Sequence, residues 1–66
     1  MAMSKKDEAQ WIVQEAGKHN TRGEIQWRID SETRTVILFK ETEWDTAMHE
    51  ELIKVLEAKM TALAGV

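Results

Sequence analysis

The 66-residue sequence contains no cysteine, no proline and no tyrosine, and it contains only three glycines. Without cysteine, the chain can form neither a disulfide nor a thiolate zinc site. It has no Gly-rich phosphate loop, no Walker lysine motif, no nucleophile elbow and no paired-carboxylate site. No motif therefore names a reaction, and we expect a protein that is not an enzyme and has no catalytic residue, no metal and no cofactor.

Long apolar runs are lacking as well. The longest is far shorter than the roughly 20 residues that a membrane-spanning helix requires. Lys5, Lys6, Asp7 and Glu8 interrupt the only segment in which a secretory signal could place its apolar region. The absence of cysteine fits a reducing compartment. We therefore expect a cytoplasmic protein with no membrane partner.

The length of the chain limits what it can bury. We expect one domain, residues 1–66, with residues 1–4 disordered. A domain of this size buries only about 60% of the surface that its unfolded chain exposes, so its stability is marginal. Small folds compensate with disulfides, a structural metal or oligomerisation. With the first two routes unsupported, the sequence favours a homodimer or a higher oligomer.

The N-terminal segment has the pattern of a helix over residues 4–17. Ser4 is suited to cap its start, with Asp7 three residues later. Gly17 fits the left-handed conformation that often ends a helix. The apolar residues share one face, a spacing typical of an amphipathic helix. We expect residues 18–23 to form a loop.

The central segment predicts a β-hairpin. Ile25, Trp27 and Ile29 alternate with polar residues, which is typical of a half-buried strand over residues 24–30 with these three side chains inward. The sequence "DSET" offers turn chemistry. Residues 34–40 are rich in β-branched and aromatic residues and predict a second strand with two apolar faces.

A second helix is expected from Thr42 to about Leu63, with Asp45 as the capping-box partner of Thr42 and Trp44 between helix and sheet. Its apolar arc is wider than a helix on one small sheet requires. Because a two-stranded ribbon is marginal in water, we expect an α+β fold, helix–β-hairpin–helix, completed as a four-stranded sheet in a homodimer. The alternative is a monomer in which one helix covers each sheet face. The expected oligomer interface comprises Met48, Leu52, Ile53, Leu56, Met60 and Leu63.

Two surfaces are candidates for binding. Trp11 lies off the apolar stripe of its helix, and exposed tryptophans are common at binding hot spots, so it is expected to contact a second subunit or another partner. The outer face of the hairpin combines arginine with an aromatic ring, as phosphate-binding surfaces do. The alternative is that Arg28 and Arg34 pair with acidic neighbours across the hairpin. The residues of this face are Gln26, Arg28, Arg34, Phe39 and Lys40.

Asp45 and His49 stand one helical turn apart, a spacing at which a carboxylate can orient an imidazole. No third ligand or second histidine of a helical zinc motif is placed by spacing, so the simpler interpretation is that Asp45 caps the helix.

The sequence thus favours a small binding protein without enzymatic activity, an inhibitor, adaptor or regulator, that acts as a homo-oligomer through contacts with another protein. The alternative function is a nucleotide- or nucleic-acid-binding module that uses the arginines of the hairpin. The formal net charge of −3 opposes phosphate binding. The order helix–hairpin–helix is common in small bacterial and phage accessory proteins, an analogy that carries little functional weight.

Overall fold

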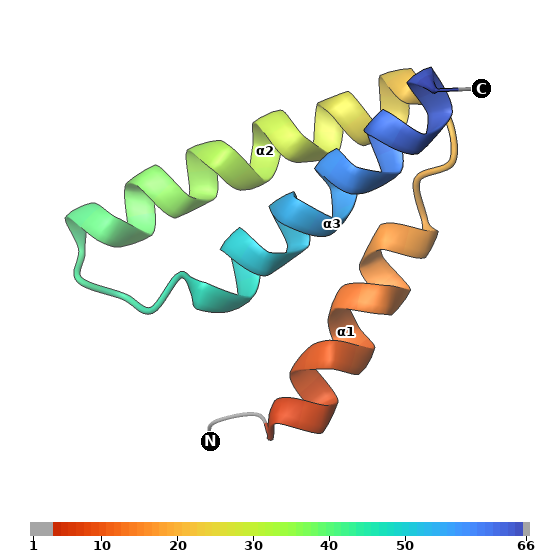
Figure 1. Cartoon of the computed structure of the whole chain (residues 1–66). Helices are drawn as coiled ribbons and strands as arrows, with labels where there is room; N and C mark the ends of the chain where they lie inside the picture. Colours follow the sequence, from red (N-terminus) through yellow and green to blue (C-terminus); the bar gives the residue numbers. More distant parts are fainter. Residues whose placement is uncertain (1–3, 66) are drawn as a thin grey trace.

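The computed structural model describes residues 4–65 as three consecutive helices (Figure 1). These are α1 (Lys5–Gly17), α2 (Arg22–Glu41) and α3 (Ala47–Ala64). No strand occurs within residues 4–65, so the predicted α+β fold, with its hairpin and four-stranded sheet, is wrong. The bacterial and phage analogy was based on that hairpin and loses its basis. Of residues 1–4, which were expected to be disordered, residues 1–3 lie outside the described part of the chain, and Ser4 is the N-cap of α1.

The segment predicted as a hairpin is one continuous helix, α2. Thr21 caps its start, because the Glu24 backbone N–H donates to the Thr21 hydroxyl at 3.2 Å and that hydroxyl donates to the Glu24 carboxylate at 2.8 Å. The segment "TRGE" has the sequence signature of a capping box, although the Glu24 carboxylate accepts the Thr21 hydroxyl and not its backbone N–H. The hydroxyls of Thr33 and Thr35 donate to the carbonyls four residues earlier, which lets these residues sit inside a helix.

Helix α1 confirms the prediction for the N-terminal segment. The Ser4 side chain caps it by accepting the backbone N–H of Asp7 at 3.2 Å. Gly17 is the last helical residue, but none of the described glycines has a positive φ, so its predicted left-handed conformation is wrong. The loop that follows is shorter than predicted, because α2 already begins at Arg22.

The last helix starts later than predicted. Thr42 does not begin it but ends α2, where its hydroxyl donates to the carbonyl of Phe39 at 3.0 Å. The chain reverses through Glu43, which has a φ of 62°, and α3 begins after Thr46. The Asp45 carboxylate accepts the backbone N–H of Ala47 at 3.0 Å, so Asp45 does satisfy a donor at the helix start.

Helix α3 lies between the other two and contacts both of them, whereas α1 and α2 barely touch. Its broad apolar arc is therefore used inside the chain. The fully buried side chains are Ile25, Leu52 and Leu56, each worth about 1.5–3 kcal/mol of transfer free energy. Trp11 and other half-buried residues pack around them, and the buried cluster with its packed neighbours comprises Ala16, Ile25, Leu52, Leu56, Trp11, Ile12, Ile29 and Met60.

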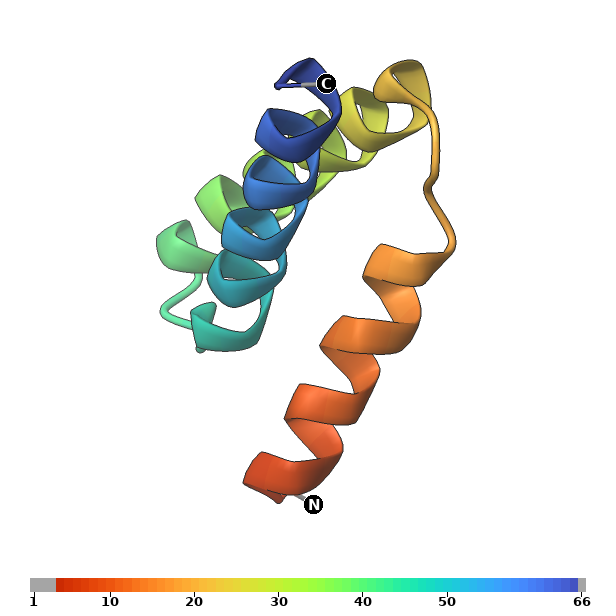
Figure 2. The same ribbon diagram turned by 45° about the vertical axis from the view of Figure 1, so that its right-hand side comes forward.

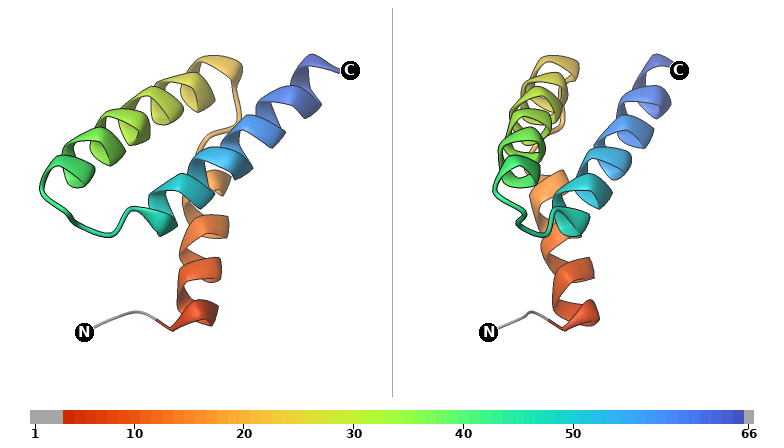
Figure 3. Two further views of the ribbon diagram at one scale, coloured as in Figure 1. Left: turned by 60° about the vertical axis from the view of Figure 1, so that its left-hand side comes forward. Right: turned by 90° about the vertical axis from the view of Figure 1, so that its left-hand side faces the viewer.

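The molecule is open in shape. Helices α2 and α3 run side by side as a hairpin, and α1 crosses them steeply with its N-terminal half projecting away (Figures 2 and 3). The radius of gyration is 12.4 Å, against roughly 10.8 Å for a compact domain of this length. None of the helices within residues 4–65 is long and apolar enough to cross a membrane.

Candidate functional site

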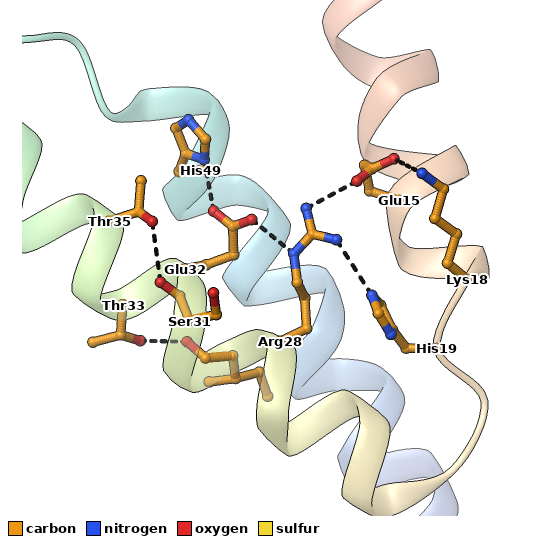
Figure 4. A network of polar contacts seen from close by, with 10 residues as sticks. Glu15, Lys18, His19, Arg28, Ser31, Glu32, Thr33, Thr35 and His49 are labelled. Atoms are coloured by element: carbon orange, nitrogen blue, oxygen red, sulfur yellow. Dashed lines mark hydrogen bonds and ion pairs between the residues drawn. The ribbon is translucent and has the colours of Figure 1, made fainter.

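A chain of polar contacts joins all three helices at their junction (Figure 4). Glu32 of α2 is its centre, with one carboxylate oxygen 2.7 Å from Arg28 Nε and the other 2.6 Å from His49 Nδ1 of α3. Arg28 also contacts Glu15 of α1 at 2.9 Å and the ring of His19 at 3.3 Å. The side chain of Glu32 is only 8% exposed, so the ion pairs at this junction are partly buried.

The donors in this network follow from the chemistry of Arg28 and Glu32. A guanidinium only donates hydrogen bonds, so in the contact with Arg28 the His19 Nε2 atom is the acceptor. An ionised carboxylate only accepts, so the His49 Nδ1 atom donates to Glu32. Within residues 4–65, no buried side-chain nitrogen or oxygen lacks a hydrogen-bond partner. The junction is therefore a fully satisfied polar network.

The ion pairs of the junction shift the pKa values of Glu15 and Arg28. The pKa of Glu15 is lowered from its ordinary value of 4.5, first by a hydrogen bond from Lys18 and then by one from Arg28. Burial disfavours the charge on Arg28, but hydrogen bonds to Glu32 and Glu15 outweigh burial and raise its pKa. A lowered carboxyl pKa stabilises the fold above the unfolded pKa, and that stabilisation is lost as the pH falls through the folded one. Only the smaller contribution, from Arg28, favours the docked α1 at neutral pH, because Lys18 lies at the end of α1 itself.

His49 lies between two aromatic rings. Its ring centroid is 5.8 Å from that of Trp11 and 5.5 Å from that of Phe39, both edge-on. The carboxylate that orients it is Glu32 and not Asp45, which instead accepts the N–H of Ala47. No group of three or more His, Asp or Glu residues within the described chain could hold a metal ion. Glu32 orients the imidazole of His49, and the ion pairs of the junction connect α1 and α3 to α2.

Most of the polar residues predicted to bind phosphate pair with other side chains of the chain instead. Arg28 is committed to Glu32 and Glu15, and Lys40 pairs with Glu50 of α3 at 3.1 Å. Gln26 donates to Asp30 at 3.0 Å on the surface of α2. These three side chains thus have partners of their own. The alternative interpretation was that Arg28 and Arg34 pair with acidic neighbours across the hairpin. Arg28 does pair with Glu32, but along a helix, and Arg34 takes part in no ion pair within residues 4–65.

Two of the three tryptophans were predicted to be buried and are exposed. Trp27, predicted to be core, is 61% exposed, and Trp44, predicted to wedge between helix and sheet, is 63% exposed beside Phe39. Trp11, predicted to be half exposed, is half buried against the core. Residues 25 and 27 are about 200° apart on a helix, so burial of Ile25 turns Trp27 to solvent.

The residues predicted as an oligomer interface on α3 do not form one outward surface. Leu52 and Leu56 are fully buried in the core of the chain, and Met60 packs against that core. Met48 and Ile53 are half buried, whereas Leu63 is 39% exposed. Of the residues that carry the polar junction, Glu15 and His19 were not predicted, and Glu32 was considered only as one of three possible acidic partners of the arginines across the hairpin. The spacing of Arg28 and Glu32, one helical turn apart, was the available signal for Glu32.

Exposed apolar side chains are the other distinctive feature. Seven large apolar residues are exposed in the described chain, whereas five apolar residues are buried. They lie on all three helices and on the α2–α3 turn: Val13, Trp27, Ile37, Leu38, Trp44, Val55 and Leu63.

An open hollow lies at the start of α2. It has a volume of about 420 Å³ and is lined by His19, Gly23, Glu24 and Trp27. The rings of His19 and Trp27 are 6.2 Å apart and form its wall. Trp27 is thus both the most exposed aromatic of α2 and part of a concave surface.

Comparison of the chain with known protein families, curated proteins and solved structures finds no significant match.

Proposed function

We propose that the protein is a small helical binding module without enzymatic activity that assembles with itself and acts through protein–protein contacts. The observation that carries this proposal is that the chain exposes more large apolar side chains than it buries. A monomer of this size has little core to stabilise it, and association would add the burial that it lacks. Tryptophan is moreover enriched at binding hot spots, and two tryptophans are exposed.

The polar junction supports the same proposal. Catalysis or phosphate binding needs charged groups that are available to a ligand, but Arg28 and Glu32 neutralise one another. Lys40 also belongs to the predicted phosphate surface, and it is paired with Glu50. Apolar contact is therefore better supported than recognition of a phosphate, and the inhibitor, adaptor or regulator roles all depend on such contact.

Sedimentation velocity over a range of protein concentrations tests the proposal. We expect the weight-average mass to rise from 7.6 kDa toward an oligomer as concentration increases. Because apolar contact drives the association, it should persist in added salt, whereas phosphate binding weakens steeply. A chain that stays monomeric at hundreds of micromolar would contradict the proposal. Salt-sensitive binding to short oligonucleotides by the monomer would favour the nucleic-acid function instead.

A further inference from the structure

One stripe of α2 faces away from the other two helices. Trp27, Ser31, Arg34 and Leu38 follow one another at spacings of four, three and four residues, which places them within about 60° on the helix surface. Trp27 is 61% and Leu38 57% exposed. The stripe lies opposite the face of α2 that carries the buried Ile25 and Val36. The stripe is apolar at both ends and polar in its middle.

The hollow at the start of this stripe is lined in part by Gly23. Nothing lies within 4 Å of the position that a Cβ would take there, and Gly23 does not have a positive φ. Neither backbone conformation nor crowding inside the chain therefore requires glycine, although glycine lowers helix stability. A side chain supplied from outside therefore has room over Gly23 and beside Trp27.

We propose that a second copy of this chain fills the hollow, with the two α2 helices antiparallel and Leu38 of each copy seated in the hollow of the other. This inference rests on the proposed function, because it assigns the surface through which the chain assembles. The hollow and Leu38 are separated by about 20 Å along α2, at 1.5 Å per residue. A two-fold axis between them forms both contacts at once, the closed arrangement that dimers favour.

The polar middle of the stripe fits this arrangement. The axis passes near Ser31, whose small side chain permits close approach of the two helices. In an antiparallel pair related by such an axis, the same flank of each helix meets, so Arg34 of one copy lies next to Asp30 of the other. Neither Asp30 nor Arg34 takes part in an ion pair within residues 4–65. The opposite charges complement each other and fix the register.

Sedimentation of three variants tests which surface is used. Leu38→Asp places a charge in the hollow, and Gly23→Leu fills it, so each should weaken dimerisation by about tenfold or more. Val13→Asp is the matched control, because Val13 is 70% exposed on α1, and it should dimerise like the wild type. Circular dichroism should show unchanged helix content in all three. A dimer that persists in Leu38→Asp and Gly23→Leu would overturn this interface and leave the proposed function intact.

Cross-linking tests the position of the two-fold axis on α2. The natural chain has no cysteine, so Ser31→Cys introduces a single thiol next to the axis. Under mild oxidation it should form a covalent dimer in high yield at concentrations where the wild type dimerises. Thr33→Cys is the control, since Thr33 is exposed at nearly the same height but on another face of α2. Equal yields from the two variants, or none from Ser31→Cys while the protein dimerises, would overturn this placement of the axis near Ser31. Wild-type protein that is only monomeric would overturn the proposed function as well.

Discussion

At position 32 a carboxylate lies where an amphipathic helix would place an apolar side chain. Ile25, Ile29, Glu32 and Val36 follow at spacings of four, three and four residues and face the interior, and Glu32 is 6% exposed. Burial of a carboxylate is costly unless it is paired and hydrogen-bonded. Arg28 and His49 supply those partners, so the residue that interrupts the apolar pattern also ties α2 to α3.

Removal of the Glu32 carboxylate should therefore be strongly destabilising. Glu32→Ala leaves Arg28 and His49 without their common partner in a partly buried site, and we expect a loss of about 3 kcal/mol of unfolding free energy. Glu51→Ala is the control, because Glu51 pairs with Lys54 at 3.4 Å on the surface, where such pairs contribute about 0–1 kcal/mol. Urea denaturation of both variants measures the difference. Equal losses would show that the junction is no stronger than a surface ion pair.

At the scale of elements, α1 was predictable from its cap and its apolar spacing, but α2 was not recognised as a helix. Three apolar residues in alternation and a run rich in Thr, Val and Ile favoured strands, since β-branched residues are enriched there. The charge at Glu32 concealed the helical stripe. Two signals did favour a helix: the "TRGE" capping box at Thr21, and the absence of any glycine or proline between Gly23 and Gly65 that could form a turn.

The hairpin and helix assignments of residues 22–41 make opposite predictions about whether Trp11 or Trp27 is more deeply buried. In a hairpin Trp27 would be core, whereas in the helical fold Trp11 packs against the core and Trp27 is exposed. Trp11→Ala should therefore cost about 2–3 kcal/mol of unfolding free energy and Trp27→Ala less than about 1 kcal/mol. Chemical denaturation at concentrations below the dimer range measures both. A larger loss from Trp27→Ala would contradict the helical assignment of residues 22–41.

At the scale of the whole molecule, the length and the missing cysteines predict marginal stability and assembly, and both stay predictions. They could not predict which surface is left apolar, because that depends on which face of each helix the fold turns inward. Leu52 and Leu56 were expected to face a partner and instead form the core, because α3 lies between two helices. Of the residues in the proposed interface, Arg34 alone had been assigned to a binding surface from the sequence.

The most direct test of the central claim, that exposed apolar side chains of α2 are covered by assembly, is the fluorescence of Trp27. In a chain carrying Trp11→Phe and Trp44→Phe, Trp27 is the one remaining fluorophore. Acrylamide quenching should be strong in dilute protein, where Trp27 is 61% exposed. We predict that quenching falls and emission shifts to shorter wavelength as the concentration rises through the range in which sedimentation detects a dimer. Quenching that is unchanged across that range would contradict the account.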